Sequence, residues 1–343
     1  MKALQATSNG APADVLAIVD IDVPEPGPGQ VLIRVRAASL NFNDIDRCYG
    51  RRISVPLSPP FTLGMDVRGT VETAGEGAEQ WLGQRVMALT TMATGGLAEF
   101  ALASADAVFP VPDTMSDAEA AAFIIPFHTA YLAIVRRAKI AAGETLLVHS
   151  GASSVGAAAI QIGKALGLKV YATVGSDDKV AYCRAMGADR VINHQSEAFD
   201  KVLLAETDHH GADVILDLAA GDFVEPSWRC IAREGRYVAA GFADDEENGF
   251  AGRPLRPLCS ANFSVLGVML SYISHVPPEI REFGFNMFTR DVGEEVHNAL
   301  LALAADGKIQ PVLSRTVPLE DAARALTEQE QRITTGRTVV ALA

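Results

Sequence analysis

Cysteines are few in this chain and widely spaced. The four of them, Cys48, Cys183, Cys230 and Cys259, form no CxxC pair, so the sequence predicts neither a disulfide framework nor a cysteine-rich zinc lobe. We expect reduced thiols and a cytoplasmic location. No run reaches the roughly 18 apolar residues that a membrane span needs. The segment 1–10 also lacks the apolar core of a signal peptide.

Basic residues are scarce relative to acidic ones. The chain has 29 Lys and Arg against 42 Asp and Glu, which gives a formal net charge of −13. This balance disfavours binding to nucleic acids and to anionic membranes, because both need a basic surface. Any phosphate site must therefore be a local positive pocket. At 343 residues with 49% hydrophobic residues, the chain can form two domains with sizeable cores.

The character of the sequence changes near residue 117. Before it, Val31–Ala37 and Val67–Thr73 alternate apolar and polar residues as β-strands do, between turns rich in Gly and Pro. After it, helical and strand patterns alternate, which is typical of a parallel sheet covered on both faces. A helix from Ser116 is predicted, with Glu119 completing a capping box and a break near Pro126.

The segment Glu144–Ala188 has the layout of a phosphate-binding β-α-β unit. A buried strand is followed by the small-residue loop Ser150–Gly156, an apolar helix and a second strand. Small residues allow close approach of a pyrophosphate, and the helix offers free N–H groups to it. Ser153 stands where the usual fingerprint has glycine. An ordinary strand–loop–helix without a ligand is the alternative.

The end of the second strand, Lys169–Val174, favours NADP(H) over NAD(H). An NAD enzyme usually has an acidic residue there to hold the ribose hydroxyls, whereas this strand runs into Gly175 and Ser176. Lys179 and His194 could then contact a 2′-phosphate. The alternative assigns Ser176 to a helix cap and Lys179 to a solvated surface. The acids Asp177 and Asp178 argue against NADP(H).

The order and spacing of several motifs resemble one known family. The motifs include AASLNFNDIDRCYG, IPFHTAY, VHSGASSVG and PLEDAARAL. Together they resemble the medium-chain dehydrogenase/reductases, and most closely their zinc-free quinone reductase branch, which includes zeta-crystallin. The resemblance implies an α/β fold with a GroES-like catalytic domain at 1–122 and 275–343. It places a Rossmann domain, with a doubly wound parallel sheet, at 123–274.

The same resemblance implies a set of cofactor contacts. They form the pyrophosphate loop, the 2′-phosphate site and the surroundings of the nicotinamide: Thr129, Ala152, Ser153, Ser154, Val155, Gly175, Ser176, Lys179, His194, Gly241, Phe242, Met269 and Leu270. For Met269 and Leu270, plain core packing is an equal alternative.

A metal-free catalytic site follows from two positions. Zinc-dependent relatives carry a ligand cysteine where this chain has Asn41, and a histidine where it has Met65. Neither residue suits a zinc site, so we expect no metal. Asn41, whose amide could polarise a carbonyl, and Tyr49 are the catalytic candidates. Relatives often have a tyrosine where this chain has Asp46.

The resemblance implies hydride transfer from NADPH to a quinone. Two alternatives stay open: a reductase of α,β-unsaturated carbonyls or enoyl thioesters, and a non-catalytic NADPH-binding or structural protein. The apolar run Phe263–Leu270 is expected to be an edge strand, and pairing with its two-fold mate would give a homodimer. The last strand, Thr338–Leu342, is expected to return to the β-rich domain.

Overall fold

The computed structural model describes residues 1–51, 57–243, 256–282 and 284–342. The chain divides into two compact units. The first comprises Met1–Ile125, Ser271–His297 and Pro311–Ala343, and the second comprises Pro126–Leu270 and Asn298–Gln310. The sequence placed the boundaries near 122 and 274 and assigned 298–310 to the first unit. In the structure this segment packs with the second unit. None of the described helices is long and apolar enough to cross a bilayer.

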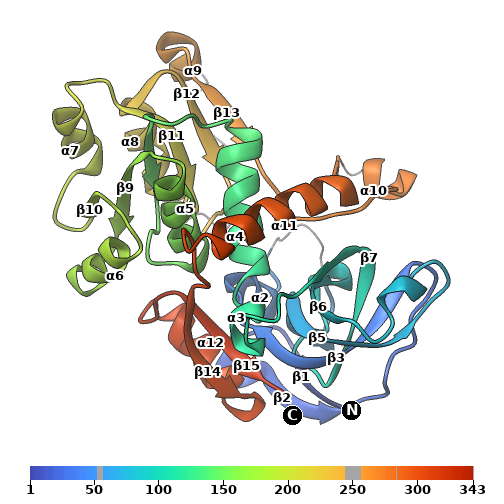
Figure 1. Cartoon of the computed structure of the whole chain (residues 1–343). Coiled ribbons are helices and arrows are strands. Elements are labelled where there is room, and N and C mark those ends of the chain that lie inside the picture. Colours follow the sequence, from blue (N-terminus) through green and yellow to red (C-terminus); the bar gives the residue numbers. More distant parts are fainter. Residues whose placement is uncertain (52–56, 244–255, 283, 343) are drawn as a thin grey trace. The chain divides into compact units, whose positions relative to one another are not determined.

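The first unit is mostly β-structure (Figure 1). Its amino-terminal elements are β1 (Lys2–Ala6), α1 (Pro12–Val15), β2 (Leu16–Asp20), β3 (Gln30–Ser39), α2 (Phe42–Cys48), β4 (Phe61–Thr62), β5 (Asp66–Ala74), β6 (Arg85–Thr90), β7 (Phe100–Pro110) and α3 (Asp117–Ala121), with short 3-10 turns η1 (Glu79–Trp81) and η2 (Thr91–Ala93). Its carboxyl-terminal elements are α10 (Pro278–Glu282), β14 (Leu313–Pro318), η6 (Leu319–Asp321), α12 (Ala322–Glu330) and β15 (Arg337–Ala341).

The last strand, β15, is an interior strand of the main sheet of this unit. The strand order is β14-β15-β3-β5-β6-β7, with a further pairing of β3 with β7 that closes part of the sheet on itself. Val339 pairs with Ser39 and Ala341 with Ala37. The expected return of the terminal strand is therefore confirmed. A second sheet, β2-β1-β4, completes the unit.

The second unit holds a six-stranded sheet that is parallel throughout, in the order β10-β9-β8-β11-β12-β13. Its elements are α4 (Ile124–Tyr131), the π-helix η3 (Leu132–Arg137), β8 (Thr145–Val148), α5 (Ser154–Ala165), β9 (Lys169–Val174), η4 (Asp177–Lys179), α6 (Val180–Ala185), β10 (Arg190–Asn193), α7 (Phe199–Glu206), β11 (Ala212–Asp217), η5 (Gly221–Phe223), α8 (Val224–Arg229), β12 (Ile231–Ala239), α9 (Arg256–Ala261) and β13 (Ser264–Gly267). Helix α11 (Arg290–Ala305) begins in the first unit and ends in the second.

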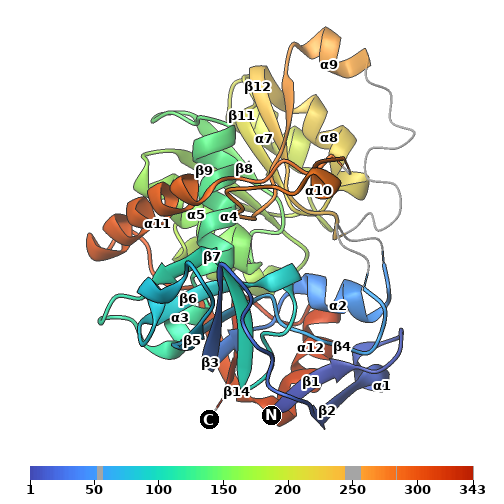
Figure 2. The same ribbon diagram turned by 90° about the vertical axis from the view of Figure 1, so that its right-hand side faces the viewer.

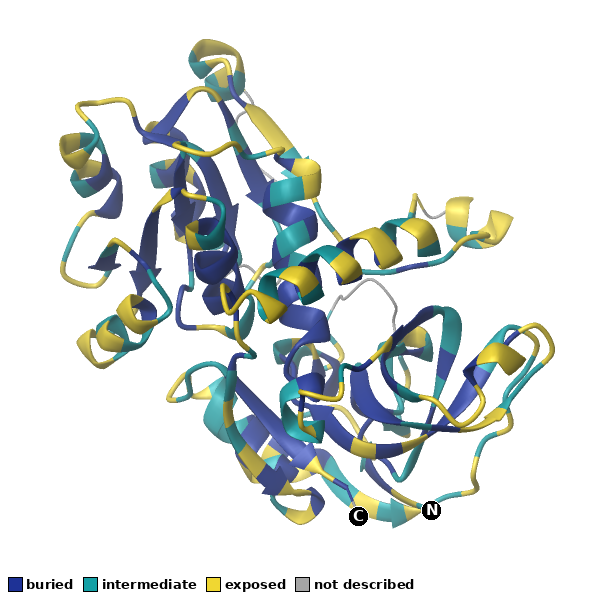
Figure 3. Cartoon of the chain, viewed as in Figure 1, coloured by how far each residue is buried: buried dark blue, intermediate teal, exposed yellow. Residues whose placement is uncertain are grey.

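Helices cover both faces of this parallel sheet. Figure 2 shows α4 and α5 on one side and α7 and α8 on the other. All four residues of β8 are buried, as expected for a strand covered on both faces, and Figure 3 shows the neighbouring strands β9 and β11 coloured mainly as buried. Tyr171 and Tyr237 belong to the core on the side of α7 and α8. The α/β class and the two-part architecture predicted from the sequence are confirmed.

Local signals explain where the helix predicted from Ser116 begins and breaks. The Ser116 hydroxyl accepts the Glu119 N–H, and Glu119 accepts the Ser116 N–H at 2.9 Å. The helix divides into α3 and α4 at 122–123. Pro126 lies in the first turn of α4, where its missing N–H leaves no helical bond unmade.

Candidate functional site

The predicted cofactor residues gather at one edge of the parallel sheet. Parallel strands all end at the same edge, and ligands of such sheets bind there. The residues directly follow the carboxyl ends of five strands: β8 leads to Ala152, Ser153, Ser154 and Val155, β9 to Gly175, Ser176 and Lys179, β10 to His194, β12 to Gly241 and Phe242, and β13 to Met269 and Leu270. Thr129 instead lies on α4, half-buried.

The loop after β8 is shaped to receive an anion. Ser150 has a φ of 53°, so the chain turns sharply out of the strand. The Ser153 hydroxyl then accepts the Gly156 N–H at 3.1 Å and caps α5, which explains why serine serves where the fingerprint has glycine. A Cβ on Gly156 would stand 2.4 Å from the Ser150 carbonyl oxygen, so only glycine allows this packing. The first-turn N–H groups of α5 fit a dinucleotide pyrophosphate.

The buried His149 lies directly before this loop and anchors it to neighbouring segments. The Ser227 hydroxyl donates to the Phe223 carbonyl at 2.7 Å, so it must accept the Nε2–H of His149 at 2.8 Å. Nδ1 of His149 is then the acceptor for the Thr173 hydroxyl at 3.0 Å. Burial lowers the pKa of His149 to about 4, with the Asp217 carboxylate opposing and His194 adding to the shift. His149 is therefore neutral at pH 7.

This histidine predicts a loss of stability in acid. Between pH 6.5 and 4 the unfolded chain binds a proton at His149 that the folded chain does not bind, so the free energy of unfolding falls as pH falls. The expected loss is about 3 kcal/mol, from a shift of roughly 2.5 pH units. Urea unfolding of the second unit, referred to below as the nucleotide unit, measures this loss over the same pH range. His149→Gln should flatten the curve, and the exposed His209→Gln should not. Equal slopes in both variants contradict the prediction.

The site expected for the adenosine end contains His194 in a fixed position. The His194 ring packs edge-on against Phe223, with centroids 4.8 Å apart, and Phe223 in turn stacks on Phe199. A Cβ on Gly175 would meet His194 Nε2 at 3.3 Å. Phe223 thereby supports the ring of His194. Asp177, one of the two acids that argued for NAD(H), accepts the Asn193 side-chain N–H at 2.8 Å.

In the first unit, Asn41 belongs to a buried polar network. Its amide nitrogen donates to the Ser39 carbonyl at 3.2 Å and to Asp66 at 3.0 Å. Its oxygen accepts from Arg337 at 2.8 Å. If the Asn41 side-chain amide were flipped, its N–H groups would face the N–H groups of the Arg337 guanidinium. The hydrogen-bond partners therefore fix the orientation of the amide. Both amide hydrogens are already donated, and a catalytic role for Asn41 stays a prediction.

Arg337 provides the positive charge of this network. It donates to both oxygens of the fully buried Asp66 at 3.0 Å. Burial raises the pKa of Asp66, and the charge of Arg337 with the hydrogen bond from Asn41 opposes the rise. Arg337 is not among the residues predicted from the sequence. The available signal was Asp66, the buried first residue of β5, because a buried carboxylate needs a cation to pair with.

Comparison with known proteins supports the family. Residues 27–113 match the family described as alcohol dehydrogenase GroES-like domain, and residues 154–285 match the zinc-binding dehydrogenase family. Quinone oxidoreductase from Mus musculus is 32% identical over 331 residues, which cover 95% of this chain and 92% of that protein. The chain belongs to the medium-chain dehydrogenase/reductase superfamily. It is accordingly an oxidoreductase of this type, with a nicotinamide cofactor.

Solved medium-chain structures share the whole fold. The quinone oxidoreductase of Thermus thermophilus, also solved in complex with NADPH, is 34% identical with a TM-score of 0.80 and full coverage of both chains. The JamJ enoyl reductase, at 24% identity, has a TM-score of 0.84 with 100% of this chain and 99% of that chain covered, and shows the same fold.

The metal position of the zinc-dependent medium-chain enzymes is chemically different here. Asn41 and Met65 are the positions at which the resemblance to the zinc-dependent enzymes implies ligands, and Asp66 is paired with the guanidinium of Arg337. Over the described parts of the chain, no group of three or more His, Cys, Asp or Glu side chains is placed to hold a metal ion. The side chains therefore do not fit a zinc site of the medium-chain type.

The second catalytic candidate of this medium-chain enzyme has other partners. Tyr49 ends α2, and its hydroxyl bonds to Glu330 of α12, which raises the pKa of Tyr49. The Arg51 guanidinium lies over its ring, 4.3 Å from the centroid. Asp46, at the position of the relatives' tyrosine, pairs with Arg51 at 3.1 Å. These contacts join α2 to α12, and a role for Tyr49 in chemistry stays a prediction.

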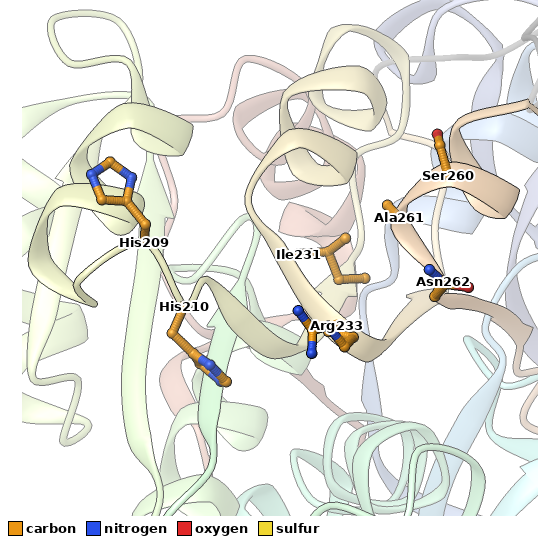
Figure 4. A pocket seen from close by; sticks show the side chains of 7 residues that line it. All are labelled: His209, His210, Ile231, Arg233, Ser260, Ala261 and Asn262. Atoms are coloured by element: carbon orange, nitrogen blue, oxygen red, sulfur yellow. The ribbon is translucent and has the colours of Figure 1, made fainter.

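A surface hollow of about 740 Å³ lies elsewhere on the nucleotide unit (Figure 4). His210 precedes β11, while Ile231 and Arg233 lie in the first residues of β12. The hollow is thus at the amino ends of the strands. Medium-chain dehydrogenases, like other open α/β proteins, bind the dinucleotide at the opposite, carboxyl edge. This hollow is therefore not part of the candidate site.

Proposed function

We propose that this protein reduces quinones with NADPH and uses no metal. The observation that carries the proposal is the Asn41–Asp66–Arg337 network, in which the polar groups of Asn41 and Asp66 are hydrogen-bonded to one another and to Arg337 rather than arranged as metal ligands. A quinone is an acceptor that requires no metal activation. When bound, NADPH supplies one hydride. The quinone takes up that hydride and a proton from solvent, giving the hydroquinone and NADP⁺.

The chain's own residues then serve binding and orientation. The N-terminus of α5 and the Ser150–Gly156 loop hold the pyrophosphate. Lys179 and His194 contact the 2′-phosphate. Close, oriented stacking of the two reactants is the main requirement of hydride transfer. The relatives from Mus musculus and Thermus thermophilus, both quinone oxidoreductases, support this assignment.

The choice of cofactor gives a direct test. Lys179→Ala and His194→Ala should each weaken NADPH binding about tenfold, because each removes a charge-assisted or polar bond to the phosphate. NADH binding should hardly change, since it has no 2′-phosphate. Fluorescence titration of both cofactors measures this, with the exposed Lys201→Ala as control. If both cofactors weaken equally, the 2′-phosphate assignment is wrong.

The acceptor is tested by NADPH oxidation with a quinone panel and an enone panel. Turnover with quinones supports the proposal. Turnover with enones alone favours the enoyl-type alternative, which the fold shared with the JamJ enoyl reductase allows. Tight NADPH binding with no turnover on either panel favours a non-catalytic protein.

We further propose a homodimer through β13. This strand ends the parallel sheet, pairs only with β12 in the described chain and exposes 37% of Val265. Pairing with a second copy would satisfy its open edge. Val265→Lys should then give a monomeric mass by sedimentation at micromolar concentration. Ile18→Lys is the control, because Ile18 is similarly exposed, at 38%, on another edge strand, β2. A monomeric unmodified protein contradicts the proposal.

A further inference from the structure

The turn between β6 and β7 contains an uncommon backbone conformation. Met92 and Ala93 are consecutive and have φ values of 55° and 52°. Left-handed conformation is unfavourable for residues with a Cβ, and two in a row require support from their surroundings. Such strain is concentrated at functional sites and persists only where neighbouring groups hold the turn.

A buried arginine holds it. Arg47, in the last turn of α2, is 6% exposed. Its Nη1 donates to the Ala93 carbonyl, and its Nη2 lies 3.5 Å from the Met92 carbonyl. The guanidinium therefore binds the carbonyl groups of the two strained residues themselves. A planar, permanently charged donor suits this task.

The same helix holds the surroundings of Asn41. Near the start of α2, Asp44 accepts the N–H groups of Asn41 at 2.9 Å and Gly64 at 3.1 Å. On the other side, the Thr90 N–H donates to the Met65 carbonyl at 2.9 Å, and the Gly95 N–H donates to that of Thr62 at 2.9 Å. The strained turn is thereby hydrogen-bonded along the segment 62–65, which leads directly to Asp66.

The result of this support is an exposed methionine. Met92 is 53% exposed and is among the large apolar side chains left outside the core. Methionine is flexible and polarisable, and it recurs on surfaces that receive varied apolar or aromatic ligands. A backbone held in strain to present such a side chain, on a turn hydrogen-bonded to the segment 62–65 next to Asp66, indicates a contact with a ligand.

We infer that Met92 contacts the acceptor and sets the preferred acceptor size, and that Arg47 is a positioning residue acting through the Met92–Ala93 turn. This inference rests on the proposed reduction of flat, apolar acceptors. Met92 adds apolar contact area for a large ring system and much less for a small one.

Binding and turnover test this separately. Calorimetry of 1,4-naphthoquinone and 1,4-benzoquinone with the NADP⁺-loaded protein compares the two ring sizes without needing turnover. Met92→Ala should weaken naphthoquinone binding about tenfold and benzoquinone binding less than about threefold, as expected for a lost apolar contact. In assays the change should appear in KM with kcat nearly unchanged. Ala93→Gly relieves strain and keeps the Met92 side chain. It should leave the ratio of the naphthoquinone affinity to the benzoquinone affinity unaltered.

Arg47 is tested by rescue. Arg47→Leu should lower the ratio of naphthoquinone to benzoquinone affinity as Met92→Ala does. Arg47→Lys should keep much of the original ratio, because the ammonium can still donate to the carbonyl groups of Met92 and Ala93. If Arg47→Leu does not fold, Met92→Ala still decides. Equal weakening of both quinones in Met92→Ala, or no binding of naphthoquinone to the unaltered protein, overturns the inference. Naphthoquinone binding without turnover overturns only the proposed reaction.

Discussion

Arg337→Met should lower the free energy of unfolding of the first unit by about 3–5 kcal/mol, the usual effect of leaving a buried carboxylate without its cation. Asp66 is fully buried, and Arg337 binds both of its oxygens at 3.0 Å. The variant also leaves the Asn41 oxygen without its donor. Urea unfolding at pH 7 measures the loss.

Two controls separate charge from packing. In the double variant Arg337→Met with Asp66→Asn, most of the stability should return, since no ionised group stays buried. Arg34→Met removes an arginine from the exposed pair with Glu72 and should change stability little, because water screens that pair. If Arg337→Met and Arg34→Met lower the free energy of unfolding by equally small amounts, the Asn41–Asp66–Arg337 network does not stabilise the first unit as predicted.

Gly156→Ala should weaken dinucleotide binding on the order of 100-fold, the scale expected for the loss of about two hydrogen bonds from loop N–H groups to the pyrophosphate. The new Cβ would stand 2.4 Å from the Ser150 oxygen and 2.9 Å from the Gly151 Cα. Both are backbone atoms and cannot rotate away, so the loop or α5 must move. Fluorescence titration with NADPH gives the dissociation constant.

The matched control for this variant is Gly27→Ala. There a Cβ meets only the Gln30 side chain at 3.4 Å, an ordinary contact. Its NADPH affinity should equal that of the unaltered protein. Circular dichroism of Gly156→Ala checks that the unit still folds. An unchanged dissociation constant in a folded Gly156→Ala protein contradicts the description of the loop.

The sequence predicts features that depend on local order along the chain. The strand–loop–helix at Ser150–Gly156 and the capping box at Ser116 could be placed because neighbouring residues make them. The strand-end residues Gly175 and His194 come to one edge because parallel strands share their direction. In each case the residues that determine the feature are close together in the sequence, or follow strands that run in the same direction.

Contacts between distant segments could not be placed in this way. Arg337 is 296 residues from Asn41, and nothing near either residue indicates their meeting. Tyr49 lies close to Asn41 along the chain, yet its hydroxyl bonds to Glu330 of α12. Phe223 supports His194 through a ring contact across two loops. Each of these depends on how elements pack, which residue spacing does not encode.

The place of β15 in the sheet has a consequence for how the chain is made. Because β15 lies between β14 and β3, the main sheet of the first unit lacks an interior strand until residues 337–341 have been synthesised. The second unit draws its whole parallel sheet from one continuous stretch, 145–267. On the ribosome, the second unit can therefore form its sheet before residues 337–341 are synthesised, while β3 still lacks its neighbour β15 and Asp66 still lacks Arg337.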